Sequence, residues 1–428
     1  MKERLSICYA APGHSLVPTA GTTRNILSLA KALSERADVT VAFRSVPKGV
    51  DPTGPFQVET IEATEDSGES LDDEATRGVN PFAHLVYLRK VRRYARETAG
   101  RFDFVLEKGW RLSGYLVHHT AVVGVPGAVV ENDARCWTGP RTGVRDSLKW
   151  CLHSAAQGLA SRYSRTAPVI IAETEELKKQ LHRVRRIPSE KIEVVPLGVD
   201  HQLFRPGGQA EAREKLRMDP ARLVFLYVGG MDKYHDLSPL LEALAALAPP
   251  NFELHLVGEG EYRPRYEEAA LRSQCPIKFH GKVRHEQVPL FIAASDLCLA
   301  PYCSQAFYDQ EITFSTLKIP EYMACARPVA GTASAGIQRL IHPGINGFLL
   351  ANRTDSWRAF ISEVPDRQEL GRMGEAARRA VQHISWEQTA SGYLQAISNH
   401  GLLTVDNELE HENTAAQRTS FALRRFGR

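Results

Sequence analysis

The chain has 428 residues, a length that predicts two or three domains. With 43% apolar and 24% charged residues, its composition is typical of a soluble globular protein. The 53 Lys and Arg residues nearly balance the 50 Asp and Glu residues, which argues against a dedicated nucleic-acid-binding protein with its large basic excess.

The sequence also argues against a membrane-spanning or a disulfide-stabilised protein. No apolar run approaches the roughly 20 residues of a membrane-spanning helix, and residues 5–11 are too short for the core of a secretion signal. The seven cysteines are scattered without a CxxC pair, so neither a disulfide framework nor a zinc site fits them. We therefore expect a cytoplasmic protein with reduced thiols.

Short β-branched runs alternate with helical patterns along most of the chain, which is typical of βαβ units and parallel sheets. The first half predicts strands at 5–10, 39–44, 104–107, 128–131, 170–173 and 192–196. The second half repeats the alternation with strands at 223–230, 252–258, 277–281, 297–301, 328–331 and 347–350. Gly and Pro residues between them mark a connector. We expect two Rossmann-like, doubly wound parallel-sheet domains facing a central cleft.

Three segments lie outside this alternation. Residues 62–80 are acidic and weakly patterned, which predicts a loop, and residues 400–428 are polar with a basic end, which predicts a flexible tail. Residues 84–97 predict a basic amphipathic helix. Such a helix would allow peripheral contact with the anionic inner face of a membrane, although a solvated helix face has the same pattern.

Ligands of open α/β sheets bind at the carboxyl ends of strands, and the first such place is the loop 12–21. Gly21 precedes a predicted helix, for which Thr22 or Thr23 is a plausible cap. A glycine there permits close approach of a ligand phosphate to a helix N-terminus, although a tight turn requires the same residue. The sequence contains no GxGxxG, which argues against a nicotinamide dinucleotide site.

A second candidate follows the strand predicted at 223–230. The pair Gly229-Gly230 ends this strand, and Lys233 precedes the start of a helix. A glycine pair followed by a cation suits an anionic ligand. Glycine-containing βα turns are common, so the signal is weak by itself.

The most specific candidate is a short stretch of the second half. Ser315 and Thr316 are predicted caps for a helix that begins near Leu317, and their hydroxyl and N–H groups suit phosphate oxygens. Lys318 and Glu321 are three residues apart and share one helix face. They form either a surface ion pair worth at most about 1 kcal/mol, or a site in which Lys318 binds a phosphate and Glu321 a diol.

Several stretches of the chain, in this order and spacing, resemble the family-four glycosyltransferases, which are retaining enzymes with the two-domain GT-B fold. The resemblance covers roughly residues 5–398 and is carried by the segments 171–177, 191–200, 204–206, 257–260, 279–283, 321–324, 328–330, 344–347 and 385–387. It implies transfer of a sugar from a UDP- or GDP-type nucleotide diphosphate donor to a hydroxyl acceptor. The acceptor classes left open are a glycan, a lipid-linked intermediate and a small natural product.

The resemblance also implies a division of the chain. Residues 1–198 would be the acceptor-binding domain and residues 199–385 the donor-binding domain. Residues 386–399 would form a helix that crosses back onto the first domain, followed by the tail at 400–428.

Site roles follow from the same resemblance. Glu321 would hold the ribose hydroxyls, and the turn that ends at Val283 would read the base. Gly21 would let the first domain approach the diphosphate. The segment 315–317 would hold the phosphates.

The chain departs from the family at three positions. Gly230 stands where members usually carry Arg, His235 where they usually carry Lys, and Thr313 where many carry a second carboxylate. A leaving diphosphate needs preorganised positive partners, and Lys318 and Lys233 are the available substitutes. The predicted donor-binding set is Gly21, Gly230, Lys233, His235, Val283, Thr313, Ser315, Thr316, Leu317, Lys318 and Glu321.

Two polar pairs follow strands of the first half, Glu107-Lys108 and Glu131-Asn132. Glu131 or Asn132 is predicted to orient the acceptor hydroxyl or the donor sugar, with Lys318 as the third catalytic candidate. Polar residues at strand ends also serve as caps or turn formers. The family is thought to need no protein nucleophile, because the departing diphosphate accepts the acceptor proton. We expect no metal or other cofactor, because the acidic cluster at 72–74 lies in the predicted loop.

Two alternative functions remain at this point. A nucleotide-sugar epimerase or a phosphorylase would use a similar pair of domains. A catalytically degenerate sugar-nucleotide-binding protein would explain the departures at Gly230 and Thr313. The sequence does not single out the sugar, the base, the acceptor or the oligomeric state.

Overall fold

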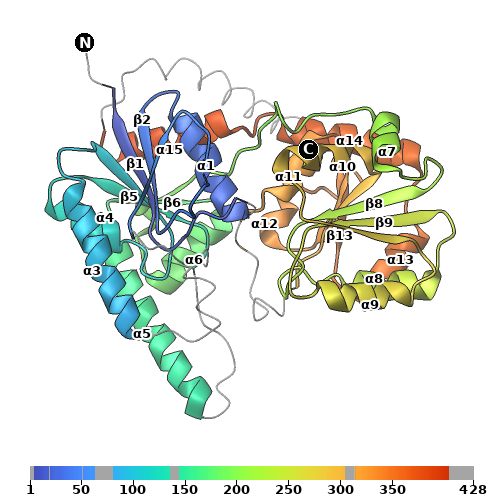
Figure 1. The fold of residues 1–428 in the computed structure, drawn as a ribbon, viewed down its shortest axis with the longest axis horizontal. Coiled ribbons are helices and arrows are strands. Elements are labelled where there is room, and N and C mark those ends of the chain that lie inside the picture. The colour runs from blue at the N-terminus through green and yellow to red at the C-terminus, as the bar shows by residue number, and fades with distance from the viewer. Residues whose placement is uncertain are drawn as a thin grey trace, which may run out of the picture.

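The computed structural model describes residues 4–18, 20–50, 52–62, 81–134, 144–303, 313 and 315–403. It contains two parallel sheets, one in each half of the chain, each covered by helices (Figure 1). The predicted loop at 62–80, with its acidic cluster, lies outside the described residues except for Glu62, and the predicted tail lies outside them from residue 404 onward.

The first sheet has seven parallel strands in the order β3-β2-β1-β4-β5-β6-β7. Their bounds are β1 Ser6–Ala11, β2 Asp38–Phe43, β3 Gln57–Thr60, β4 Phe104–Lys108, β5 Gly127–Glu131, β6 Val169–Ala172 and β7 Ile192–Val194. Alternate residues of β1 enter different cores. Ile7 and Tyr9 pack with α1 (Gly21–Leu33) and α15 (Trp386–Asn399), whereas Cys8 and Ala10 pack with α3 (Pro81–Glu97) and α4 (Tyr115–Val122). Apolar residues on both faces are expected of a covered parallel sheet.

The second sheet has six parallel strands in the order β10-β9-β8-β11-β12-β13. Their bounds are β8 Leu223–Val228, β9 Phe252–Val257, β10 Ile277–Gly281, β11 Leu297–Ala300, β12 Val329–Thr332 and β13 Gly347–Leu350. One face packs with α7 (Gln209–Leu216), α10 (Val288–Ala294), α11 (Lys318–Ala324), α12 (Ala335–Gln338) and α14 (Arg367–Val381). The other face packs with α8 (Ser238–Leu247), α9 (Arg263–Leu271) and α13 (Thr354–Ser362). The predicted fold class is confirmed.

Each strand predicted from the sequence is present, with ends displaced by two residues or fewer. The sequence analysis missed β3, whose Gln-Val-Glu-Thr sequence at the sheet edge is half-exposed and carries little apolar pattern. The first domain is completed by α5 (Val144–Thr166), α6 (Glu175–Arg185) and a 3-10 turn at Ser189–Lys191. A second such turn, at His285–Gln287, precedes α10 in the second domain.

The basic helix predicted at 84–97 forms as α3. Tyr87, Val91 and Tyr94 are buried against the first sheet, so most of the apolar side that would enter a membrane packs on protein instead, although Leu85 is exposed. Peripheral membrane contact remains a prediction that rests on the basic side chains and Leu85. No helix within the described ranges is long and apolar enough to cross a bilayer.

Helix α15 returns from the second domain to the first. Its Trp386, Tyr393 and Ile397 lie in the same core as α1. At its start, Val199 and Ser385 form an isolated parallel bridge, and a Cβ on Gly198 would lie 2.4 Å from the backbone nitrogen of Trp386. The chain passes between the domains twice, and these two connections touch each other at residues 198 and 385, where we propose the domain boundaries.

Gly198→Ala is expected to destabilise the chain by about 1–3 kcal/mol, because the new methyl group overlaps the backbone at Trp386. Urea or thermal unfolding measures the effect. Gly371→Ala is the matched control, since Gly371 lies within α14 with no atom within 4 Å of its Cβ position. The control should be neutral or stabilising by roughly 0.5–1 kcal/mol. Equal stability of the two variants would contradict a close contact at Gly198.

Candidate functional site

A cavity of about 1250 Å³ lies between the carboxyl ends of the two sheets. Its lining includes the start of α1, the ends of β4, β5 and β6, the loops after β8 and β9, and the segment 315–318 before and at the start of α11. The predicted residues that line it are Gly21, Asn132, Gly230, His235, Val283, Thr313, Ser315, Thr316, Leu317, Lys318 and Glu321. Segments from the first and the second half of the chain thus line the same cavity.

Two glycines shape the second-domain wall of the cavity. Gly258 has φ +133°, and a Cβ there would lie 1.9 Å from the carbonyl oxygen of Gly229. Gly229 has φ +155°, and its Cβ would lie 2.6 Å from Nζ of Lys318. Both conformations favour glycine. The missing side chains let the loops after β8 and β9 touch and leave room for an ammonium group.

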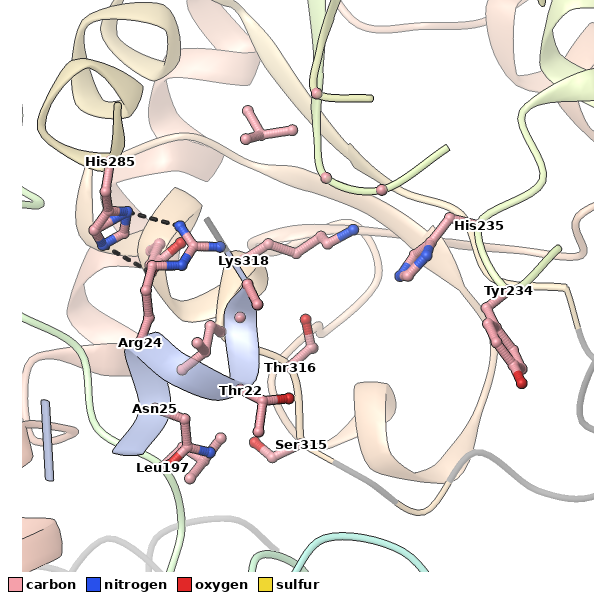
Figure 2. A pocket seen from close by; sticks show the side chains of 18 of the residues that line it. Thr22, Arg24, Asn25, Leu197, Tyr234, His235, His285, Ser315, Thr316 and Lys318 are labelled. Atoms are coloured by element: carbon pink, nitrogen blue, oxygen red, sulfur yellow. Dashed lines mark hydrogen bonds and ion pairs between the residues drawn. The ribbon is translucent and has the colours of Figure 1, made fainter. Parts of the chain in front are cut away.

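Lys318 begins α11 and extends into the cavity toward His235 (Figure 2). Its Nζ lies 4.6 Å from the ring centre of Tyr227 and 5.5 Å from that of Tyr302, and it donates to the Tyr227 hydroxyl at 3.4 Å. Burial lowers the pKa of Lys318 to about 7, although Asp232 and Glu321 act to raise it. A bound anion would raise this pKa and stabilise the ammonium form.

His235 faces the same part of the cavity and is held by Asp232. The Oδ1 atom of Asp232 lies 3.0 Å from Nδ1 of His235 and accepts hydrogen bonds from the backbone N–H groups of Tyr234 and His235. The imidazole ring lies 5.0 Å from the ring of Tyr302. Burial and the Lys318 charge lower the pKa of His235.

Glu321 lies one helical turn after Lys318. Burial raises its pKa to about 7, although Arg24 and Lys318 act to lower it. Nε2 of His285 lies 3.8 Å from Oε1 of Glu321, and Nδ1 of His285 accepts a hydrogen bond from Arg24 at 2.8 Å. Burial and the Arg24 charge lower the pKa of His285 to about 4, so we assign it a neutral ring with its proton on Nε2.

This chain of contacts crosses the cavity, because Arg24 belongs to α1 of the first domain (Figure 2). The sequence analysis did not identify Arg24 or His285. Their proximity to Gly21 and Val283 in the sequence was the available signal, since Arg24 follows Gly21 by three positions and His285 follows Val283 by two.

The first-domain wall contains a second buried pair. Nζ of Lys108, at the end of β4, lies 3.3 Å from Oε1 of Glu173, which follows β6. Asn25 of α1 donates to the same oxygen at 3.4 Å, and the backbone N–H of Ser315 also hydrogen bonds to Glu173. Burial raises the pKa of Glu173, although Lys108 acts to lower it. This carboxylate joins the first-domain wall of the cavity to the segment before α11.

Two predicted residues do not line the cavity. The Glu131 carboxylate accepts a hydrogen bond from Arg185 of α6, and both side chains are buried. Glu131 therefore belongs to an interior ion pair, and the neighbouring Asn132 reaches the cavity instead. The Lys233 ammonium lies 5.0 Å from the ring centre of Tyr234 and is not among the residues that line the cavity.

The predicted helix caps are wrong. Helix α1 has Ala20 at its N-cap and no side-chain cap, and Thr23 accepts instead from the N–H of Val17 at 3.1 Å. Helix α11 starts one residue later than expected, with Leu317 at its N-cap. Thr316 accepts from the Tyr302 hydroxyl at 2.9 Å. These hydroxyl groups form hydrogen bonds with residues outside their own helix, which a local sequence pattern does not reveal.

Glu107 and Thr313 also have structural partners. Glu107 accepts hydrogen bonds from the Trp110 indole and from the N–H groups of Gly114 and Val117, at 2.6, 2.9 and 2.9 Å, which orders the start of α4. The Thr313 hydroxyl donates to Gln180 of the first domain at 2.9 Å. Within the described part of the chain, no group of three or more His, Cys, Asp or Glu residues is placed to hold a metal ion.

Glu131→Ala is expected to lower the free energy of unfolding by about 3–5 kcal/mol, because Arg185 is left buried without its carboxylate. Asn132→Ala is the matched control. Its Oδ1 is buried and accepts no hydrogen bond from the described residues, so stability should change by about 1 kcal/mol or less. Denaturant unfolding compares the two variants. A stable Glu131→Ala protein with lost transfer activity would return Glu131 to the catalytic candidates.

Comparison with known proteins places both halves of the chain. Residues 19–203 match the family described as Glycosyltransferase Family 4, and residues 222–365 match the family described as Glycosyl transferases group 1. The chain is 30% identical over 237 residues to the D-inositol 3-phosphate glycosyltransferase of Segniliparus rotundus, covering 53% of this chain and 51% of that one. For the same enzyme of Nocardia farcinica the identity is 26%, covering 72% and 69%. The chain spans about half the length of most of the curated relatives it matches.

Solved structures share the fold. The sucrose-phosphate synthase of Thermosynechococcus elongatus has a TM-score of 0.72 at 17% identity, over 92% of this chain and 99% of that one. The Anabaena protein Alr3699/HepE, solved with UDP-glucose, has a TM-score of 0.68 at 19% identity, over 92% and 100%. The two matched sequence families follow one another in the order of the two parallel sheets, and the chain belongs to the family 4 glycosyltransferases of the GT-B fold.

Proposed function

We propose that this chain transfers a sugar from a nucleotide diphosphate sugar to a hydroxyl group of an acceptor, with retention of configuration. The observation that carries the proposal is the placement of Lys318 and Glu321, which lie half-buried one helical turn apart in a cavity between the two sheets. A cation suits a diphosphate and a carboxylate suits the two hydroxyls of a ribose. The Anabaena neighbour, solved with UDP and with UDP-glucose, supports the same kind of donor.

In this proposal the second domain binds the donor. Glu321 accepts hydrogen bonds from the ribose hydroxyls, and the turn at Val283 faces the base. Lys318 and His235 lie on the diphosphate side of the cavity. Gly21 and Gly230 leave the backbone of each domain accessible to the phosphates. The charge that develops on the leaving diphosphate is then met by groups already in place, which is the usual source of catalysis in such sites.

The first domain binds the acceptor. Asn132 offers a buried Oδ1 that accepts no hydrogen bond from the described residues, and it suits an acceptor or sugar hydroxyl. We nominate no protein nucleophile, and the departing diphosphate takes the proton of the attacking hydroxyl. The residues of the cavity act without a metal or another cofactor in this scheme. The curated relatives named as D-inositol 3-phosphate glycosyltransferases favour a polyhydroxylated acceptor.

A panel of UDP-glucose, UDP-N-acetylglucosamine, GDP-mannose and ADP-glucose tests the donor. One of these is expected to raise the melting temperature, because a ligand at 100 times its Kd stabilises the folded state by about 2.7 kcal/mol. The stabilising donor is then incubated with and without acceptor sugars and polyols. Release of sugar and nucleotide from the donor alone would favour the epimerase or phosphorylase alternative. Binding without turnover by any acceptor would favour a binding protein.

Glu321→Gln is expected to weaken binding of the nucleoside part, uridine or guanosine, by about tenfold or more, since the ribose loses at least one charged hydrogen bond. The pKa of Glu321 is raised to about 7, so nucleoside affinity of the unmodified protein should fall as pH drops through 7 and the carboxylate gains a proton. The variant should lack this pH dependence. Glu375→Gln, on the exposed side of α14, is the control. Wild-type nucleoside affinity in Glu321→Gln would remove Glu321 from the ribose site.

A further inference from the structure

The side chain of Lys318 is half-buried in the cavity wall, and it has no carboxylate partner among the described residues. Among the residues that the structure describes, no carboxylate oxygen lies within 4 Å of its Nζ, and its hydrogen-bond partner is the Tyr227 hydroxyl at 3.4 Å. The rings of Tyr227 and Tyr302 stand beside it. Gly229 leaves the space that Nζ occupies, since a Cβ there would lie 2.6 Å from this atom. The wall thus leaves room for the Lys318 amine, and no described carboxylate lies within ion-pair distance to stabilise its charged form.

His235 supplies a second titratable base beside this cation. Oδ1 of Asp232 lies 3.0 Å from Nδ1 of the imidazole and also accepts hydrogen bonds from the backbone N–H groups of Tyr234 and His235, which fixes the turn that carries the ring. The backbone carbonyl of His235 accepts from Tyr266 at 3.2 Å, which anchors the loop against α9. The ring is therefore held in place before any ligand enters.

The charged and titratable groups around these two side chains come from five segments of the chain. Lys318 is faced by Asp232 and His235 of the loop after β8, by Tyr227 of β8, by Tyr302 after β11, by Glu321 of α11 and by Arg24 of α1. His235 is faced by Asp232, Lys318, Tyr227 and Tyr302. Arg24 is the only permanent cation of this set, and Asp232 is an anion that would repel a phosphate.

We propose that Asp232, His235 and Lys318 form a proton-dependent phosphate subsite, in which His235 and Lys318 take up protons as the diphosphate of the donor enters. The inference rests on the proposed function and assigns the charge state of its donor site. With both groups protonated, they and Arg24 supply three positive charges, which face Asp232, the ionised form of Glu321 and the two negative charges of a sugar diphosphate. Without the protons, Arg24 would be the one positive charge of this set that faces the dianion and the Asp232 carboxylate.

The empty pocket favours the neutral forms of both groups. Burial lowers the pKa of Lys318 to about 7 and also lowers the pKa of His235. A neighbouring anion acts in the opposite direction. Each proton taken up on binding makes the affinity fall by up to tenfold for each unit of rising pH. Asp232 is a positioning residue in this account, since it holds and stabilises the charged imidazole.

Isothermal titration calorimetry tests the proposal in two buffers of different ionisation enthalpy, neither of them phosphate. UDP-glucose is compared with uridine, or a GDP-sugar with guanosine if the panel selects it. Sugar diphosphates do not titrate near neutral pH, and Glu321 contributes to both ligands of a pair through the ribose. The sugar nucleotide is expected to take up about one proton more than the nucleoside near pH 7.5.

Variants identify the side chain that takes up the proton when the sugar nucleotide binds. His235→Lys replaces the imidazole with an amine whose unperturbed pKa is about four units higher. The amine should therefore be charged to a greater extent before binding, so proton uptake should decrease and affinity at pH 8.5 should rise severalfold over the unmodified protein. His235→Gln and Asp232→Asn should lose uptake and bind the sugar nucleotide more weakly, with nucleoside affinity unchanged. His383→Gln, at an exposed position after α14, is the control.

The outcomes separate this inference from the proposed function. Equal proton uptake by the sugar nucleotide and the nucleoside, with the sugar nucleotide still bound, overturns the inference and leaves the proposed function standing. Unaltered uptake in His235→Gln also overturns it, because His235 is then not a proton acceptor. Failure of every sugar nucleotide to bind between about pH 6 and 9 contradicts the proposed function itself.

Discussion

The constraint on which the cleft depends is the withdrawal of the Lys318 side chain from water, because it disfavours the ammonium form until an anion enters. Removing an ion from water costs several kcal/mol, and in most interiors a carboxylate offsets it. Here two tyrosine rings and one hydroxyl take that place, and aromatic faces stabilise a cation only by about 0.5–2 kcal/mol. The glycines at 229 and 258 are needed for the same reason, because they let the two loops close around the ammonium without filling its space.

A second constraint is that each wall of the cleft contacts the other. Arg24 reaches His285 from the first domain, and Glu173 accepts the N–H of Ser315. Arg339 of the second domain lies 3.1 Å from Glu176 of the first. Together with the return of α15, these contacts set the distance between the sheets. The carboxylate expected to bind a ribose is therefore positioned by an arginine of the opposite domain, and neither half contains a complete site.

The sequence allowed the sheets, their order in the chain and most of the cavity lining to be predicted, because parallel strands are apolar on both faces and their carboxyl ends carry the ligand loops. It did not separate Glu131 from Asn132. Successive side chains of a strand point to opposite faces, so one of this pair enters an ion pair with Arg185 and the other enters the cleft. The sequence also did not separate Lys233 from His235. The turn fixed by Asp232 directs His235 into the cavity, whereas Lys233 does not line it.

Lys318 and Glu321 both have a pKa near 7, and their titrations are opposed. The amine is charged below this pH and the carboxylate above it. Binding of the diphosphate at Lys318 and binding of the ribose at Glu321 therefore affect each other. A diphosphate stabilises the ammonium, and the ammonium in turn lowers the pKa of Glu321, which keeps the carboxylate ionised for the ribose hydroxyls. A nucleoside alone has no diphosphate and does not stabilise the Lys318 ammonium in this way. The helix that carries both residues thereby links recognition of the phosphates to recognition of the ribose.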